Sequence, residues 1–388
     1  MSSILDTYAR KPISFIRGEG SFLFTEKEEK YLDWIAGIAT NILGHCHPHM
    51  VKAIQDQSKK LIHVSNAVII KEAESLAKRI TDNTFADKVF FCSSGTESVE
   101  GAIKIVRRYF YTIGKPEKNK ILSMSGAFHG RTIAALFLAN NKSHTEGFGP
   151  SPEGFGQVPF GDHEALKKAI NKNTAAIICE PIQGEGGVKV VPDYCLKGLR
   201  EICDEHGILL IFDSIQVSFR TGTLLGFENS GISPDICCVA KGFGNGFPVG
   251  AILLTNEVAK GMTHGSHGTT FGNNLLACAA VHATLDVVLA KGFFEEVKTK
   301  GEYFDKELKK LKSSFPKIIE EVRGIDFIKG LKLKVDNNNF MSKLMERKLL
   351  VVKASENCIR LFPSLLSTTE ELDMGLEIVK KVCEEYRD

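Results

Sequence analysis

The chain has 388 residues, of which 43% are hydrophobic and 25% are charged, and its formal net charge is +2. This length suits about two to three domains, and the weak charge without a run of Lys or Arg argues against a nucleic-acid partner. The first ten residues lack the apolar core of a signal peptide, and no stretch approaches the roughly 20 apolar residues of a membrane span. Ten scattered cysteines without a Cys-x-x-Cys pair indicate reduced thiols. We therefore expect a cytoplasmic protein with no membrane contact.

The first 80 residues predict a hairpin followed by helix. Apolar and polar residues alternate over residues 20–34, as in a short antiparallel hairpin. Apolar residues then recur at helical spacing over residues 49–80.

The middle of the chain alternates short apolar runs with helical stretches. The runs are Val89–Cys92, Ile121–Leu122, Ala175–Cys179, Ile208–Phe212 and Ile236–Ala240. This alternation predicts an α/β fold with a largely parallel sheet between helices.

The last third of the chain predicts a smaller unit. Residues 275–285 favour a long helix, and residues 297–388 favour a helix, short strands and a closing helix, which is typical of an α+β domain. We expect residues 1–48 to form the N-terminal segment of the small domain, residues 49–288 the large domain, and residues 289–388 the C-terminal part of the small domain.

Two polar residues follow apolar runs of the predicted sheet. Asp213 comes directly after Ile208–Phe212, and Lys241 directly after Ile236–Ala240. In α/β proteins such residues point into the ligand crevice. An amine can form an imine with an aldehyde, and a carboxylate can keep a pyridine nitrogen protonated. The pair predicts pyridoxal phosphate as cofactor, although singly the two residues could be an exposed lysine and a helix cap.

A helix start follows the run Val89–Cys92. Ser94 and Glu97 fit a capping box, and the glycine between them lets backbone amides approach an anion. A helix N-terminus favours phosphate, and we expect this one to lie in the same crevice as Lys241 and Asp213. We therefore predict that the segment binds a phosphate; the alternative is an ordinary capped helix.

Three further segments carry polar groups. In Phe128–Arg131 an aromatic ring could stack on a cofactor and a guanidinium could bind a carboxylate, or the two could be core and surface residues. Glu185 lies in a Gly-rich segment without the GxGxxG spacing of dinucleotide sites, and it needs a cation, for which Arg360 is a candidate. The histidines of His45–His49 are too close together for the usual metal sites, so we expect a polar turn and no metal.

Together these segments resemble the class III aminotransferases, the ornithine/4-aminobutyrate type of pyridoxal-phosphate enzymes, and within them the bacterial acetylornithine aminotransferases. The likeness runs in order along nearly the whole chain, through segments such as Gly37–His45, Ser94–Glu97, Phe128–Thr132, Glu180–Glu185, Ala240–Gly242 and His267–Gly272. It implies the fold type I of pyridoxal-phosphate-dependent transferases, with a mostly parallel seven-stranded sheet between helices plus the smaller α+β domain.

The resemblance implies roles for the residues around the cofactor ring. Lys241 would bind the cofactor covalently and transfer the proton, and Asp213 would pair with the pyridine nitrogen. Gln216 would contact the phenolic oxygen, and Phe128 would stack on the ring.

The resemblance also implies how the phosphate is held. Gly95 and Thr96 would bind it within the chain, and Thr270 would reach the phosphate of the partner subunit, so a homodimer is expected.

For the substrates, the resemblance implies two arginine sites. Arg131 would bind the α-carboxylate, while Arg360 and Glu185 would form a pair that opens when a dicarboxylate enters. The implied reaction is a ping-pong transfer from N-acetylornithine to 2-oxoglutarate, giving N-acetylglutamate 5-semialdehyde and glutamate in arginine biosynthesis.

The chain departs from the family pattern near the predicted site. Ser214 stands where the family usually has Glu, and Val217–Gly222 is one residue shorter and lacks both internal glycines. Since a misplacement of about 1 Å can cost about a hundredfold in rate, a cofactor-binding relative with weak activity is an alternative. Ornithine, succinyldiaminopimelate and 4-aminobutyrate aminotransferases are others; a nicotinamide-dependent oxidoreductase is disfavoured because the dinucleotide fingerprint is missing.

Overall fold

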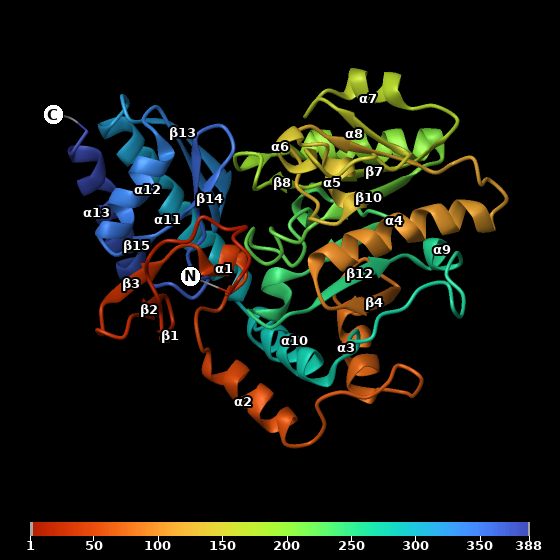
Figure 1. Cartoon of the computed structure of the whole chain (residues 1–388), viewed down its shortest axis with the longest axis horizontal. Helices are drawn as coiled ribbons and strands as arrows, with labels where there is room; N and C mark the ends of the chain where they lie inside the picture. Colours follow the sequence, from red (N-terminus) through yellow and green to blue (C-terminus); the bar gives the residue numbers. More distant parts are fainter. Residues whose placement is uncertain (1–2, 387–388) are drawn as a thin grey trace.

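The computed structural model describes residues 3–386, so residues 1–2 and 387–388, the outer ends of the expected small-domain segments, lie outside it. Figure 1 shows two regions side by side. One holds the central sheet with its helices, and in the other the N-terminal strands, coloured red, lie beside C-terminal elements coloured blue.

The larger region is built on a seven-stranded sheet of order β4-β12-β11-β10-β7-β5-β6. Its strands are β4 (Lys88–Cys92), β5 (Lys120–Met124), β6 (Phe155–Val158), β7 (Thr174–Cys179), β10 (Leu209–Asp213), β11 (Ile236–Val239) and β12 (Gly250–Leu254). Only β12 runs antiparallel to its neighbours β11 and β4. The prediction of a largely parallel α/β sheet is therefore confirmed.

Both faces of this sheet are buried. Successive strand residues point to opposite faces, so Ile211 packs into the core on one face while Leu210 and Phe212 pack into the core on the other. The surrounding helices are α4 (Gly95–Thr112), α5 (Ile133–Ala139), α6 (Lys142–Thr145), α7 (His163–Ala169), α8 (Asp193–His206) and α9 (Asn256–Ala259). Burial on both sides explains why the strands are continuous apolar runs rather than alternating ones.

The smaller region contains two four-stranded sheets. One has the order β1-β2-β3-β15, with strands β1 (Arg17–Glu19), β2 (Phe22–Phe24), β3 (Lys30–Asp33) and β15 (Leu349–Leu350). The other has the order β13-β14-β17-β16, with strands β13 (Ile319–Ile325), β14 (Ile328–Leu333), β16 (Val352–Ala354) and β17 (Cys358–Leu361). The helices of the smaller region are α11 (Phe293–Ser314), α12 (Asn337–Glu346) and α13 (Thr369–Glu384).

The predicted N-terminal hairpin is confirmed as β2 and β3, which pair antiparallel. Strand β15 then adds to β3 in parallel, with Leu349 opposite Leu32. The two chain ends thus share one sheet, and this pairing supports the division at residues 48 and 288, which we keep as a proposal.

One helix prediction is wrong in extent. Residues 49–80 form two helices, α2 (Pro48–Ser58) and α3 (Lys71–Thr81), with no helix over residues 59–70. Leu61 and Ile62 are exposed, so they form no apolar face that could pack a helix against the core, and a turn closes with Val68 N donating to Ser65 O at 3.2 Å. The helix predicted over residues 275–285 is confirmed as α10 (Leu275–Val288).

Among residues 3–386, no individual helix combines the length and the apolar character needed to cross a membrane. Within this range, α10 and α11 together have sufficient length and apolar character, but they are bent by 71° relative to each other.

Candidate active site

The central sheet brings Asp213 and Lys241 to one edge. Asp213 is the last residue of β10 and lies opposite Cys238 of β11, the adjacent parallel strand. Lys241 follows β11 and opens the short 3-10 helix η2 (Lys241–Gly244). Both side chains line one cavity of about 540 Å³. The crevice predicted at the carboxyl ends of these strands is therefore present.

Asp213 is buried and bound from two sides. Its Oδ2 lies 2.8 Å from His129 Nδ1, and its Oδ1 accepts a hydrogen bond from Ile215 N at 3.1 Å. The other ring nitrogen of His129, Nε2, is buried with no hydrogen-bond partner among the described residues. His129 therefore orients the carboxylate, a role that the sequence analysis did not assign although it singled out the segment.

A second carboxyl group, Glu180, also lines the cavity and was missed by the sequence analysis. Its Oε2 accepts a hydrogen bond from Phe128 N at 3.0 Å. Burial, reinforced by the charge of Asp213, raises the pKa of Glu180 well above its ordinary value. The pocket thus places a second carboxyl group, less acidic than usual, near Asp213.

Lys241 has an unusual backbone and an altered basicity. Its φ is 49°, in the left-handed region that non-glycine residues rarely occupy. Burial lowers the pKa of Lys241 to about 8; Glu185 opposes this shift and Arg360 reinforces it. A lowered pKa supplies the neutral amine that attacks an aldehyde or accepts a proton near neutral pH.

This lowered pKa predicts how the amine reacts in cofactor-free protein. Acetylation of Lys241 should rise with pH around a midpoint near pH 8, because only the neutral amine reacts, whereas ordinary lysines titrate near a pKa of about 10.4. Labelling between pH 6 and pH 10, quantified by peptide mapping, measures the midpoint. The exposed Lys260 serves as the internal reference, and identical profiles for the two lysines would contradict the assignment.

The start of α4 forms the wall expected to hold a phosphate. Gly95 and Thr96 line the cavity. Ser94 caps the helix by accepting from Glu97 N at 3.3 Å, while the Glu97 carboxylate accepts from Ser93 N at 2.8 Å instead of from the Ser94 amide of a strict capping box. A Cβ on Gly95 would lie 2.9 Å from Ile215 Cδ1, so this close approach favours glycine.

Phe128 and Arg131 lie together in the cavity wall. The guanidinium carbon of Arg131 is 5.5 Å from the centre of the Phe128 ring, and Arg131 N donates to Thr96 Oγ1 at 3.3 Å. The Arg131 side chain is exposed and its Nη2 lies 3.4 Å from His144 Nε2. Its guanidinium therefore remains available to an incoming carboxylate.

The sequence analysis proposed Arg360 as the cation near Glu185, and the structure brings the two together. Both guanidinium Nη atoms of Arg360 bind the Glu185 carboxylate, with Nη2–Oε2 at 2.9 Å, and Nη1 also donates to Gln216 Oε1 at 3.4 Å. Arg360 is only 2% exposed. A Cβ at residue 184 would lie 1.5 Å from Gln216 Oε1, so Gly184 is required for this arrangement. Gln216 lines the cavity, whereas Glu185 and Arg360 are not part of its lining.

The structure does not bring Thr270 to the cavity of its own chain. Thr270 is exposed and absent from the cavity lining. Its neighbour Thr269 accepts a hydrogen bond at its carbonyl oxygen from Asn66 Nδ2 at 2.9 Å.

Two of the three histidines in the segment His45–His49 bind carboxylates. His45 Nε2 lies 2.8 Å from Asp33 Oδ2, and His49 Nε2 lies 2.7 Å from Asp286 Oδ2. Within residues 3–386, no group of three or more His, Cys, Asp or Glu residues is arranged to hold a metal ion.

The α/β fold with a lysine and an aspartate at the ends of adjacent strands defines the class of pyridoxal-phosphate enzymes. The sequence model of the family described as Aminotransferase class-III matches residues 6–383. The chain belongs to this family, which confirms the predicted fold, enzyme class and cofactor.

Known relatives match almost the full chain. The acetylornithine aminotransferase of Agrobacterium fabrum is 51% identical over 378 residues, covering 97% of this chain and 95% of that protein. The ornithine aminotransferase of Toxoplasma gondii, crystallised with oxidised glutathione and described with partial occupancy of PLP at its active site, has a TM-score of 0.95 at 29% identity, covering 99% of this chain and 93% of that one. The acetylornithine aminotransferase of Elizabethkingia anophelis has a TM-score of 0.87 at 31% identity, covering 98% and 96%.

The residues in the cavity fit pyridoxal phosphate. A helix N-terminus suits its phosphate, the buried carboxylate of Asp213 suits a protonated pyridine nitrogen, and the amine of Lys241 suits its aldehyde.

Proposed function

We propose that the chain transfers the amino group of N-acetylornithine, or a similar ω-amino acid, to 2-oxoglutarate, and so produces N-acetylglutamate 5-semialdehyde and glutamate for arginine biosynthesis. The observation that carries this proposal is the meeting of Lys241 and Asp213 in one cavity at the ends of adjacent parallel strands. The similarity to acetylornithine aminotransferases supports the choice of substrate.

Pyridoxal phosphate, when bound, supplies an electron sink for charge that develops on the substrate carbon. The amine of Lys241 would take the proton from the substrate carbon that bears the amino group and pass it on to the cofactor within the same half-reaction, and in the second half-reaction it would move a proton in the reverse direction. Asp213, oriented by His129, supplies the negative charge at the pyridine nitrogen. Gly95 and Thr96 hold the phosphate, Phe128 covers the ring, and Gln216 binds the phenolic oxygen.

The two substrates differ in charge beside the reacting carbon: 2-oxoglutarate carries a carboxylate on that carbon, and N-acetylornithine does not. Arg131 binds the α-carboxylate of the donor, which lies remote from its reacting amine, and the paired Arg360 and Glu185 present a neutral wall beside the uncharged reacting carbon. When a dicarboxylate enters, Glu185 leaves and Arg360 binds the second carboxylate. A displaceable partner lets one site accept both substrates.

A panel of amino donors tests this proposal. With 2-oxoglutarate as acceptor, kcat/KM for N-acetylornithine should exceed that for ornithine, succinyldiaminopimelate and 4-aminobutyrate by about tenfold or more, the discrimination that pocket contacts provide. A higher kcat/KM for another donor would show that the chain prefers that donor. Cofactor binding without transfer from any donor would instead identify a weakly active relative.

We also propose a homodimer in which Thr270 reaches the cofactor phosphate of the partner subunit. The exposure of Thr270 away from its own cavity supports this role. Thr270→Val should weaken cofactor binding by about tenfold or more, because a hydrogen bond to a charged group is lost. Equilibrium dialysis measures the change.

Co-expression of subunits carrying Lys241→Ala with subunits carrying Thr270→Val shows whether Thr270 acts across the subunit interface or within its own subunit. If Thr270 acts across the interface, mixed dimers regain one intact site and activity exceeds that of either variant. Activity no higher than that of the Thr270→Val protein would show that Thr270 acts within its own subunit.

A cytoplasmic location is part of the proposal. All ten cysteines are thiols and nine of them are buried, as in proteins of reducing compartments. Recovery of the activity in a membrane or secreted fraction would contradict it.

A further inference from the structure

Glu185 lies in the tip of a small hairpin between the two regions of the molecule. Strands β8 (Ile182–Gln183) and β9 (Lys189–Val190) pair antiparallel, and residues 184–188 join them. On the side of the large region, Gln183 Nε2 donates to Ser125 O at 3.1 Å. On the side of the small region, Ser355 N donates to Glu185 O at 2.9 Å. The hairpin is therefore bound to both regions of the molecule.

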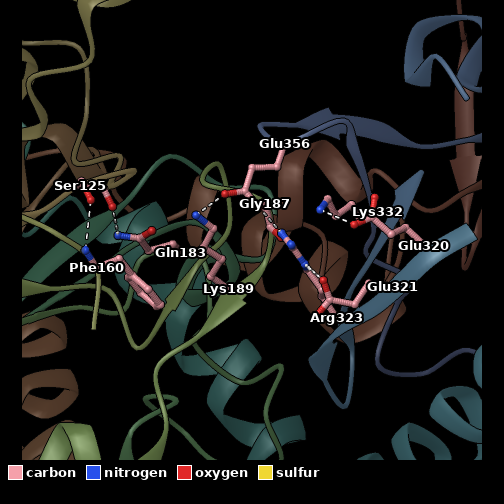
Figure 2. Close-up of polar contacts among 10 residues, drawn as sticks. All are labelled: Ser125, Phe160, Gln183, Gly187, Lys189, Glu320, Glu321, Arg323, Lys332 and Glu356. Carbon is pink, nitrogen blue, oxygen red and sulfur yellow. Dashed lines mark hydrogen bonds and ion pairs between the residues drawn. The ribbon is translucent and has the colours of Figure 1, made fainter. Parts of the chain in front are cut away.

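Three charged residues fasten the far side of this hairpin to the small region. They are Lys189 of the hairpin itself, Arg323 and Glu356, and we name them the clasp. Arg323 of β13 donates through Nη1 to Gly187 O at 3.0 Å and to Glu356 Oε2 at 2.7 Å, and Lys189 of β9 pairs with the other oxygen of Glu356. Figure 2 shows Arg323 between Gly187 and Glu321, with Glu356 reaching Lys189. Burial opposes the charge on Glu356, yet its bonds to Lys189 and Arg323 outweigh burial and lower the pKa of this carboxyl.

Glu356 occupies a backbone conformation that disfavours glutamate. It lies in the turn between β16 and β17, where Cys358 N donates to Ser355 O at 3.3 Å. The φ values of Glu356 and Asn357 are 59° and 55°, as in a type I′ turn, which prefers Asn, Asp or Gly. Strained residues of this kind cluster at functional sites. Here the strained residue uses both carboxylate oxygens to bind the hairpin and β13.

The hairpin tip approaches its binding partners closely. Gly187 has a φ of 106°, and a Cβ there would lie 3.0 Å from Arg323 Nη1 and 3.1 Å from Ser355 O. The clasp therefore fixes the backbone on the C-terminal side of Glu185, and the Ser355 amide fixes the carbonyl of Glu185 itself.

We propose that the clasp is a specificity-determining device that places Glu185 against Arg360. With the tip held by its backbone, only the side chain of Glu185 is free to leave Arg360 when a dicarboxylate enters. A loosened tip leaves Arg360 unneutralised for a larger share of the time, which favours 2-oxoglutarate and disfavours an acylated donor. This inference rests on the switch role given to Glu185 and Arg360 in the proposed function.

Glu356→Asn in the holoenzyme tests the clasp, because Asn suits the turn but cannot reach both cations. The ratio of kcat/KM for N-acetylornithine to kcat/KM for 2-oxoglutarate should fall about three- to tenfold, mainly through a higher KM for the donor. The turnover number should change less than about twofold, and the melting temperature should not fall, because the strain in the turn is relieved. Lys189→Met should shift the same ratio, and Lys189→Arg should restore it.

Glu320→Gln is the matched control. Glu320 is 41% exposed, close to the 37% of Glu356, but it binds Lys332 Nζ of β14 at 2.5 Å rather than the hairpin (Figure 2). This variant should leave the ratio unchanged.

Glu185→Gln separates the clasp from the switch itself. It should shift the ratio in the same direction and further. If it shifts the ratio while Glu356→Asn and Lys189→Met do not, the clasp proposal is overturned. If Glu185→Gln leaves the ratio unchanged, the switch of the proposed function fails, and the clasp fails with it.

Discussion

Lys241→Ala is expected to lower the rate of amino transfer by about 10⁴-fold, the upper range for removal of a positioned acid–base group. The variant loses both the amine that binds the cofactor aldehyde and the base that moves the substrate proton. Residual turnover should be measured in single-turnover reactions with the donor that has the highest kcat/KM. Borohydride reduction followed by peptide mapping should show no cofactor attached to the chain.

The fold should survive this substitution. Alanine and lysine share the Cβ that makes the φ of 49° unfavourable, so the backbone strain at residue 241 is unchanged. Burial disfavours the charged amine, so its removal should leave the melting temperature equal or higher. Lys260→Ala, which removes an exposed amine, should keep full activity. Cofactor fixed to another lysine in the wild-type protein would refute the assignment of Lys241.

The strands that carry the site were predictable from sequence because they are buried on both faces. An apolar run such as Ile208–Phe212 ending in a carboxylate predicts both a strand and the placement of Asp213. Strand β12 (Gly250–Leu254) was missed although it is apolar, because it follows directly on a Gly-rich segment and no helical stretch separates it from β11. Strand β6 (Phe155–Val158), which pairs parallel with β5, was missed as well, so the apolar runs located five of the seven strands.

Contacts between distant segments could not be predicted in the same way. His129 meets Asp213 across 84 residues, and a histidine between an aromatic residue and a glycine gives no sign of that partner. The clasp is harder still, since Lys189, Arg323 and Glu356 look like ordinary surface charges in sequence. They meet only because the sheet β13-β14-β17-β16, which carries Arg323 and the β16–β17 turn with Glu356, lies against the β8–β9 hairpin with Lys189.

The shortened segment 217–222 shows how the fold accommodates a departure from the family pattern. Phe219 has a φ of 69° and is 2% exposed, so an aromatic residue occupies a conformation usual for glycine while packing in the core. Gln216 nevertheless lines the cavity. Burial of the aromatic ring offsets the backbone strain, so the segment is accommodated while Gln216 stays in the cavity lining.

Asp213→Asn is expected to lower turnover by about 10³-fold, the upper range for loss of a preorganised electrostatic group. The amide has nearly the same shape but lacks the charge that keeps a pyridine nitrogen protonated. Pre-steady-state measurement of each half-reaction should show the loss in the proton-transfer step, while cofactor stays attached to Lys241. His129→Asn should have a smaller effect, about tenfold, because it removes only one of the two bonds that orient the carboxylate.

The same variant separates the catalytic role of Asp213 from a structural one. If Asp213 served only as a cap, its essential bond would be the one that Oδ1 accepts from Ile215 N at 3.1 Å. An asparagine side-chain oxygen accepts that bond equally well, so a cap predicts unchanged turnover and an unchanged melting temperature. A loss of turnover much larger than that of His129→Asn, with an unchanged melting temperature, therefore assigns the negative charge itself to the reaction, because both variants alter the bond to His129 Nδ1 but only Asp213→Asn removes the charge.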